Sequence, residues 1–210
     1  MIQQIHVGGF DDNFSYFIED SDSKNIAIVD PSNVKLIEAE ISKNFFSPKM
    51  ILLTHSHFDH TEGVAELVKK LAIPVYMHEN ARGRVNVLDE MAVYIKGGEK
   101  IKLENIFIDV IDTPGHIDDA VCFYLKEDKA LLTGDTVFVE GCGRADLEFS
   151  KVEDLFKSLQ KIKKLPDDTK IFPGHDYGKK PWSTIKDEKK NNPYFKVKTL
   201  DDFIKLRLPV

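Results

Sequence analysis

Short apolar runs and helical apolar spacings alternate along the first half of the chain. Runs of apolar and β-branched residues that end at Gly, Asp, Asn or Pro predict strands. These runs occupy residues 2–7, 14–19, 26–29, 49–53 and 74–77. We expect the first two to pair antiparallel across a turn at residues 8–13. Apolar residues spaced three or four apart predict one helix beginning near Val34 and another over about 62–71. The resulting order, β-β-β-α-β-α-β, is typical of an α/β fold.

The second half of the chain contains strand patterns first and helical patterns afterwards. We expect strands at residues 106–111, 121–125, 130–133 and 171–172, of which the middle two form a hairpin. Ser150 and Glu153 have the spacing of a capping box, which predicts a helix running to about Ile162. The polar tail ends in a further helical stretch near residues 200–206.

Length and composition agree with one globular unit. The chain has 210 residues, of which 42% are hydrophobic and 30% charged, so a sizeable core is expected. No repeat or linker interrupts it, and we expect one domain over residues 1–210 with a short helical tail at about 180–210. No apolar run approaches the ~20 residues that span a bilayer, and residues 1–6 lack a signal-peptide pattern. Two cysteines make no disulfide framework, so we expect a reduced, cytoplasmic protein.

The net charge of −6 is unevenly distributed along the chain. Residues 1–150 contain 26 acidic and 14 basic residues, whereas residues 151–210 contain 9 acidic and 15 basic residues. A basic segment can favour an anionic substrate or nucleic acid, but it is more often the solvated face of helices. No nucleic-acid-binding module accompanies it, so a nucleic-acid-processing function is the weakest hypothesis.

One loop concentrates side chains that bind metal ions. Between a buried strand and a helical pattern, six residues supply three imidazoles and one carboxylate, those of His55, His57, Asp59 and His60. Imidazole and carboxylate are ligands of zinc, iron and manganese. A single histidine would suit a polar surface loop, but this density favours a metal site.

Three further strand patterns are followed by residues that bind metals, namely His116, Asp135 and His175. Ends of strands lie along one edge of a sheet, where sites collect. A glycine precedes each of the three and, having no Cβ, lets the chain turn the next side chain inward. The sequence therefore predicts one cluster of seven ligands.

Seven ligands are too many for one metal ion and suit two. The expected triads are His55, His57 and His116 for one ion and Asp59, His60 and His175 for the other. Asp135 stands alone in its loop and has two oxygens, so we expect it to bridge the ions, with Asp59 and Asp135 as the catalytic carboxylates. The expected cofactors are two divalent ions, zinc before iron or manganese. Between ions about 3.5–4 Å apart, a bridging hydroxide is a nucleophile at neutral pH.

These motifs, taken in order, resemble those of the metallo-β-lactamase-fold superfamily. The resemblance rests on Thr-His-Ser-His-Phe-Asp-His, Thr-Pro-Gly-His, Gly-Asp-Thr and Pro-Gly-His, and it spans residues 54–177. The sequence around residues 14–30, including Asp30, is also similar. The resemblance implies a four-layer αββα sandwich with the metals at one edge.

Within the superfamily, the region after Asp135 resembles the glyoxalase II branch, whose enzymes hydrolyse glutathione thioesters. The resemblance assigns substrate contacts to Arg144, after Gly-Cys-Gly, and to Tyr177, after the last histidine motif. Two features depart from that branch, because Asp146 stands in place of a second tyrosine and the C-terminal helical domain is shortened. The resemblance implies a metal-dependent hydrolase of a hydroxyacylglutathione-like thioester, with a small anionic thiol-derived substrate.

The same stretches also resemble the persulfide dioxygenases. Those enzymes carry Gly-Cys-Gly-Arg-Thr-Asp where this chain has residues 141–146, and His-Asp-Tyr where it has residues 175–177. Over these two stretches this chain differs only at Ala145, which replaces the threonine. That branch uses one iron, held by the residues matching His55, His116 and Asp135. A mononuclear iron dioxygenase acting on glutathione persulfide is therefore the alternative, and the full set of seven ligands places the hydrolase first.

Other residues of catalytic type have ordinary structural explanations. His6 and His78 lie outside the metal motifs and are expected at the surface or packed inside. Cys142 lies in a glycine-rich loop, where we expect a small turn residue and not a reactive thiol. Asp118 and Asp119 follow the third motif and either hydrogen-bond ligand imidazoles or cap a turn.

Overall fold

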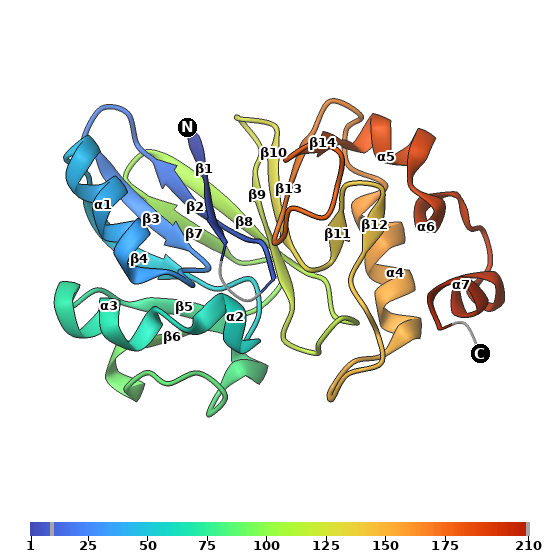
Figure 1. The fold of residues 1–210 in the computed structure, drawn as a ribbon, viewed down its shortest axis with the longest axis horizontal. Coiled ribbons are helices and arrows are strands. Elements are labelled where there is room, and N and C mark those ends of the chain that lie inside the picture. Colours follow the sequence, from blue (N-terminus) through green and yellow to red (C-terminus); the bar gives the residue numbers. More distant parts are fainter. Residues whose placement is uncertain (9–10, 209–210) are drawn as a thin grey trace.

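The computed structural model describes residues 1–8 and 11–208, and within them two large sheets pack face to face (Figure 1). The middle of the turn expected at residues 8–13 lies outside the described residues. The first sheet has the strand order β1-β2-β3-β4-β5-β6. Its strands are β1 (Ile2–Gly8), β2 (Asn13–Glu19), β3 (Asn25–Val29), β4 (Ser47–Leu52), β5 (Val75–His78) and β6 (Ala92–Ile95).

The second sheet has the order β14-β13-β10-β9-β8-β7. Its strands are β7 (Lys100–Leu103), β8 (Ile106–Asp112), β9 (Val121–Leu125), β10 (Ala130–Gly134), β13 (Lys170–Pro173) and β14 (Ser183–Thr184). A small separate ribbon pairs β11 (Val137–Phe138) with β12 (Gly141–Cys142). The predicted pairing of the first two strands and the predicted hairpin of β9 with β10 are both antiparallel and confirmed.

Helices cover the outer face of each sheet. The first sheet carries α1 (Val34–Asn44) and α3 (Val64–Leu71), and the short α2 (Phe58–Thr61) lies at its edge. Two 3-10 turns, η1 (Glu79–Ala81) and η2 (Asp89–Met91), precede β6. The second sheet carries α4 (Val152–Ile162), α5 (Ile185–Asn191), α6 (Pro193–Lys196) and α7 (Leu200–Arg207). The layers are α, β, β and α, which confirms the expected sandwich.

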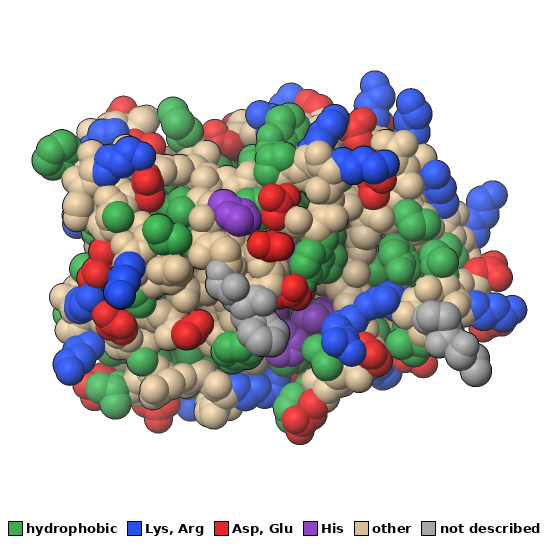
Figure 2. All heavy atoms as spheres, viewed as in Figure 1, with side chains coloured by type: hydrophobic (Ala, Val, Ile, Leu, Met, Phe, Trp, Pro, Cys, Tyr) green, Lys and Arg blue, Asp and Glu red, His purple; other side chains and the backbone are tan. Residues whose placement is uncertain are grey.

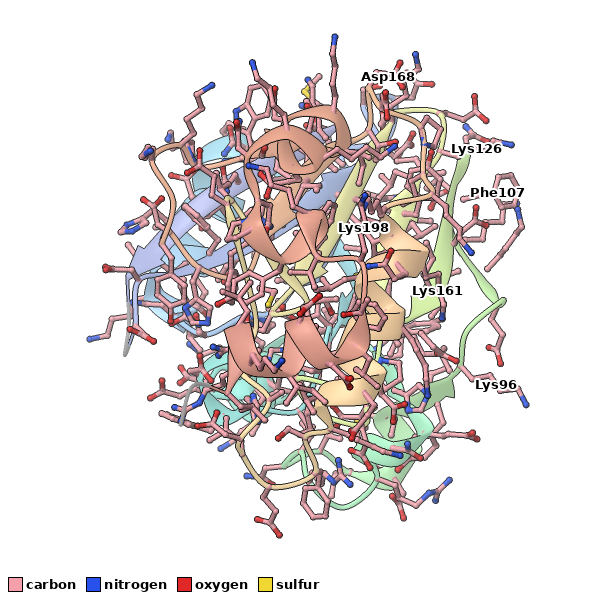
Figure 3. The ribbon with its side chains drawn as sticks, turned by 90° about the vertical axis from the view of Figure 1, so that its right-hand side faces the viewer. Lys96, Phe107, Lys126, Lys161, Asp168 and Lys198 are labelled. Atoms are coloured by element: carbon pink, nitrogen blue, oxygen red, sulfur yellow. The ribbon has the colours of Figure 1, made fainter. Side chains whose placement is uncertain are left out.

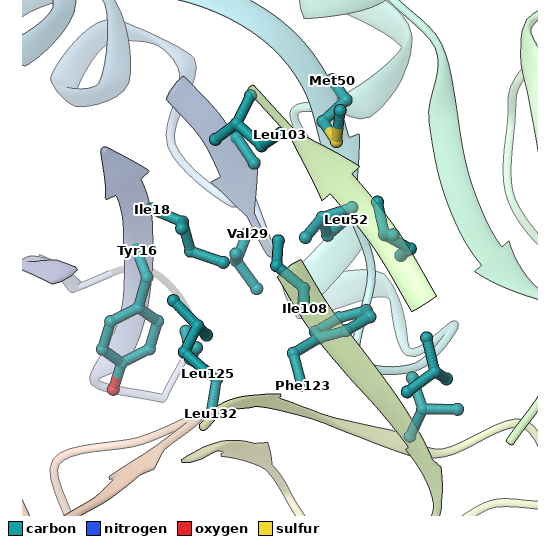
Figure 4. Close-up of a cluster of buried hydrophobic side chains, with 14 of the residues drawn as sticks. Tyr16, Ile18, Val29, Met50, Leu52, Leu103, Ile108, Phe123, Leu125 and Leu132 are labelled. Atoms are coloured by element: carbon teal, nitrogen blue, oxygen red, sulfur yellow. The ribbon is translucent and has the colours of Figure 1, made fainter. Parts of the chain in front are cut away.

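Alternating side chains explain why both faces of the central strands are buried. In β2, Tyr16 and Ile18 join the cluster between the two sheets, whereas Phe17 joins the cluster beneath α1 and α3. Across the interface Phe123 and Ile108 of the second sheet pack into the same inner cluster (Figure 4). Burial of one such side chain stabilises the fold by about 1.5–3 kcal/mol. The packed sheets therefore hold the strand ends, and the loops after them, in fixed places.

Two local predictions need correction. The capping box does not form, because Ser150 Oγ donates to the Leu147 carbonyl oxygen (2.6 Å) and α4 has no side-chain cap. The helix expected at about 62–71 begins two residues later, at Val64, and a separate short helix, α2, precedes it. Gly63 between them approaches Pro31 so closely that a Cβ would lie 2.4 Å from its carbonyl oxygen. The strands β6, β7 and β14 were not predicted, since such short segments carry too little periodicity to identify a strand.

The C-terminal segment packs onto α4 rather than extending into solvent (Figure 3). Phe195 and Phe203 are fully buried there. The labelled lysines Lys126, Lys161 and Lys198 lie apart from one another on this side, and Lys161 Nζ donates to a backbone carbonyl (2.5 Å). The basic residues of 151–210 are likewise spread over α4, α5 and α7, with Lys161, Lys189 and Lys205 as examples. None of the helices in residues 1–8 and 11–208 has the length and apolarity needed to cross a membrane.

Candidate metal centre

The seven predicted ligands lie together where strands of both sheets end, and histidine side chains are visible in a hollow at the centre of this face (Figure 2). Two of them, His55 and His57, lie in the loop after β4, and the helix α2 carries the next two. The remaining three follow β8, β10 and β13, so three strands of the second sheet each contribute one ligand. The contributions of both sheets meet because their ends lie at the same edge of the sandwich.

Two triads form within this cluster. The triads are His55, His57 and His116, and Asp59, His60 and His175, with the ligand atoms of each triad within 4.8 Å of one another. Asp135 lies between them: its Oδ2 is 3.5 Å from His116 Nε2, and its Oδ1 is 3.3 Å from His60 Nε2. One carboxylate thus reaches both triads.

The outer nitrogens of four imidazoles are held by fixed partners. These contacts are His55 Nδ1 to Thr54 Oγ1 (3.0 Å), His60 Nδ1 to Asp30 Oδ2 (3.1 Å), His116 Nδ1 to the Arg144 carbonyl oxygen (2.9 Å) and His175 Nδ1 to the Asp11 carbonyl oxygen (2.6 Å). A carbonyl oxygen only accepts, so His116 and His175 donate through Nδ1 and present the Nε2 lone pair to the centre. Partners of this kind orient metal-binding histidines.

The donor atoms fit metal ions better than they fit one another. His55 Nε2 is buried and has no hydrogen-bond partner among the described residues. His57 Nδ1 lies 2.9 Å from His116 Nε2, and His60 Nε2 lies 3.2 Å from His175 Nε2. A buried acceptor without a partner destabilises the fold, and a cation placed among such lone pairs would satisfy them. Imidazole and carboxylate in this number suit two divalent ions.

The protonation of the metal-free cluster reflects the same need for positive charge. Burial lowers the pKa of His55 well below its ordinary value and that of His57 to about 4, so both are neutral at pH 7. Burial also opposes the charged form of His60, but Asp135 and Asp30 outweigh it and raise this pKa. The pKa of Asp135 is lowered despite burial, because His60 and His175 stabilise its charge. Burial opposes the charged form of His175 as well, but Asp135 outweighs it and raises the pKa of this imidazole.

Glycines permit the close approach of the ligand loops. A Cβ on Gly174 would lie 2.3 Å from Asp135 Oδ1 and 2.8 Å from His60 Cε1, so no other residue fits there without displacing the ligands. Gly134 has φ +47°, and a Cβ there would lie 2.4 Å from Thr54 Oγ1, so only glycine fits this position. Both positions match the expected role of glycine before a ligand.

Sequence reasoning missed several residues that hold the ligands. Asp30 is buried; its Oδ1 accepts from the Thr54 N–H (2.8 Å) and its Oδ2 from the Thr54 hydroxyl (2.6 Å), besides the contact with His60. Asn13 Nδ2 donates to Asp59 Oδ2 (3.0 Å). Asp30 follows β3 directly, so the rule that ligands follow strands could have identified it. Asp30, His55 and His60 also form a group whose ligand atoms lie within 4.8 Å of one another, but both oxygens of Asp30 accept from these donors, so we interpret it as a supporting residue.

A cavity of about 650 Å³ opens over the ligands. Phe58, Phe138 and Leu147 supply apolar lining, and Arg144 and Arg207 supply positive charge. Arg207 belongs to α7, and its Nε donates to the Gly143 carbonyl oxygen (2.7 Å). No sequence motif indicated Arg207, since only the packing of the C-terminal helix brings it to the cavity.

The two residues expected to contact substrate also line this cavity. The Arg144 guanidinium makes two hydrogen bonds to Asp146, of 2.8 and 2.9 Å. The Tyr177 hydroxyl donates to Asp11, and its ring stacks on His175 with centroids 4.7 Å apart. Both therefore have partners within the chain.

The remaining residues of catalytic type lie outside the ligand set. His6 is half-exposed and packs edge-on against Phe14, and His78 accepts a backbone N–H through Nδ1. The Cys142 thiol is buried, which raises its pKa to about 12 and leaves it protonated at neutral pH. Within residues 1–8 and 11–208, the hydrogen bonds and ion pairs of the Asp119 carboxylate are with Ser56 and Arg84 and not with an imidazole; its role is considered below.

Comparison with known proteins agrees with this architecture. Residues 8–175 match the metallo-beta-lactamase superfamily model. The chain is 34% identical over 197 residues to a probable polyketide biosynthesis zinc-dependent hydrolase, PksB, of Bacillus subtilis, covering 93% of this chain and 87% of that protein. It is 34% identical over 202 residues to a hydroxyacylglutathione hydrolase of Pelagibacter ubique, covering 94% of this chain and 82% of that one.

Among solved structures, ETHE1 from Myxococcus xanthus superposes with a TM-score of 0.86 at 25% sequence identity. The match covers 100% of this chain and 92% of that chain. Because the family model spans most of the chain and the relatives align over almost all of it, this chain belongs to the metallo-beta-lactamase superfamily.

Proposed function

We propose that this chain hydrolyses a thioester, with a hydroxyacylglutathione as the first substrate to test. The observation that carries the proposal is the meeting of two ligand triads at one carboxylate, Asp135. Two divalent ions, zinc in the first place, would supply a water nucleophile of lowered pKa and polarise the scissile carbonyl. The hydrolase names of the relatives support this reaction class. Buried free thiols at Cys122 and Cys142 suit a cytoplasmic enzyme.

The two catalytic carboxylates have different tasks in this proposal. Asp135 reaches both triads and would hold both ions. Asp59 Oδ2 lies 3.4 Å from the Nε2 atoms of both His60 and His175, so one oxygen belongs to the second triad. Asp59 also lines the cavity, which places it within reach of a proton released there. It is therefore our candidate for the group that accepts this proton.

The cavity suits a substrate with an anionic thiol part. Arg207 has no carboxylate partner among the ion pairs of the described residues, whereas Arg144 is paired with Asp146. We assign the first contact with the anionic group to Arg207, and a second contact to Arg144 once substrate competes with Asp146. Tyr177 would contact the same part of the substrate from the wall beside His175.

The alternative is a mononuclear iron dioxygenase that acts on glutathione persulfide. The specific observation in its favour is the match with ETHE1 over nearly the whole of both chains. In that reaction His55, His116 and Asp135 would hold one iron, and the second triad would bind no ion.

One experiment separates the two functions. The protein is purified anaerobically, its metal content is measured, and thiol release from a hydroxyacylglutathione is followed beside oxygen uptake with glutathione persulfide. For the hydrolase we expect two ions per chain, thiol release, and loss of that activity in His60→Ala and His175→Ala. Oxygen uptake with one iron per chain and activity that survives His60→Ala would replace the hydrolase by the dioxygenase.

A further inference from the structure

The carboxylate of Asp119 is fully buried beside the metal centre but belongs to neither triad. It lies in the loop between β8 and β9, and its Oδ1 accepts a hydrogen bond from the backbone N–H of Ser56 (3.2 Å). Ser56 stands between His55 and His57, which are both ligands of the first triad. The bond therefore fixes the short extended segment from which these two imidazoles project.

A buried carboxylate requires a compensating cation, and Arg84 supplies it. Arg84 Nη1 lies 3.3 Å from Asp119 Oδ2, and within the described residues this is the ion pair that Asp119 forms. The same guanidinium donates to Asp118 through both terminal nitrogens, Nη1 to Oδ1 and Nη2 to Oδ2 (3.1 Å). Arg84 comes from the segment between η1 and η2, so it joins the first sheet's loops to the loop that carries His116.

The other face of the guanidinium contacts the rim of the cavity. Arg84 Cζ lies 4.1 Å from the ring centroid of Phe149, a cation–π distance. Phe149 is half-exposed and has φ +60°, and the contact with Arg84 covers one face of its ring. The same loop carries Arg144 and Leu147, which line the cavity.

We propose that Arg84 is a positioning residue that holds the first metal triad through Asp119 and Ser56 and holds the cavity rim through Phe149. The second triad is independent of it, because Asp30, Asn13 and Asp11 support those ligands instead. The proposal rests on the assignment of the metal ligands and not on the identity of the substrate.

The test is a zinc titration of metal-free protein against a chromogenic chelator, which needs no substrate. Arg84→Gln should lower the affinity for one of the two zinc ions by about tenfold or more, because a ligand loses its supporting partner. The affinity for the other ion should stay unchanged. Arg82→Gln is the matched control, since Arg82 comes from the same segment but its guanidinium lies over the ring of Tyr94 in β6 (3.9 Å). Two unchanged affinities, or a parallel loss of both together with a lower unfolding temperature, would overturn the proposal.

A double variant shows whether Arg84 acts through the buried charge. Asp119→Asn can still accept the Ser56 N–H but needs no cation, so Arg84→Gln combined with Asp119→Asn should recover the affinity that Arg84→Gln loses. No recovery would refute the link through Asp119. If Arg84→Gln does not fold, Arg84→Lys is tested instead, because lysine keeps the charge but lacks the planar guanidinium. It should lower the affinity for the same zinc ion by a smaller factor, and an unchanged affinity would count against the proposal.

The rim contact has its own readout. Phe149→Ala should raise KM for the hydrolysed thioester while both zinc affinities stay at their wild-type values. An unchanged KM would remove the rim from the proposal. If no thioester is hydrolysed, the proposed function fails, but the zinc titrations still decide the role of Arg84.

Discussion

Replacing Asp30 by Asn should weaken the binding of both metal ions at once. The carboxylate of Asp30 accepts three hydrogen bonds, two from Thr54 and one from His60 Nδ1. An amide NH2 in the place of Oδ2 would face two donors, so His60 would lose its acceptor and the Thr54 hydroxyl would reorient away from His55. A hydrogen bond to a charged group is worth ~1.5–3 kcal/mol. Because His55 and His60 belong to different triads, each ion should bind about tenfold to a hundredfold more weakly.

The measurement is the stepwise zinc affinity of the metal-free variant by chelator competition, with circular dichroism as a check of folding. Asp20→Asn is the control, because Asp20 is also buried but accepts from Ser23 at the far end of β2. Arg84→Gln is expected to lower the affinity for one zinc ion only, whereas Asp30→Asn should lower both affinities. A folded Asp30→Asn protein with both wild-type affinities would refute the role assigned to this carboxylate.

Three further outcomes follow from the site. Asp135→Ala should remove activity and most bound metal, whereas Cys142→Ala should keep both, as metal analysis and thiol-release assays can show. Arg207→Gln should raise KM for an anionic thioester at least about fivefold, since a charge-assisted hydrogen bond is lost, while Lys205→Gln on the same helix should not. In metal-free protein the His57 imidazole should titrate by NMR near pH 4. Because the unfolded chain binds that proton near pH 6.5, His57 lowers the free energy of unfolding as pH falls from 6.5 to 4, and His57→Gln should reduce this decline.

The clustering of the seven candidate ligands was predictable because metal-binding chemistry depends on residue type and on local position. Histidine and aspartate directly after apolar runs identify strand ends without knowledge of which strands are neighbours. The same rule was not extended to Asp30, although it follows β3 in the same way. Periodicity also identified most of the strands, because their side chains alternate between two buried faces.

The contacts between distant loops were not predictable from the sequence. Ser150 and Glu153 have the spacing of a capping box, yet the Ser150 hydroxyl bonds within the preceding turn. Arg144 carries the same charge as Arg207, but its guanidinium is hydrogen-bonded to Asp146. In each case the chain offers several partners of suitable chemistry, and the packing selects one.

The sequence alone predicted the cluster of seven candidate ligands from residue types and short-range spacing, and the family resemblance predicted the αββα class and the two candidate reactions. Only the tertiary structure showed that Arg207 reaches the cavity, that Asp30 supports both triads, and that Arg84 joins Asp119 to Phe149. The physical reason is that these contacts join segments far apart in the chain, whose distances are set by the packing of two sheets and their helices. No local pattern of residues encodes such a distance.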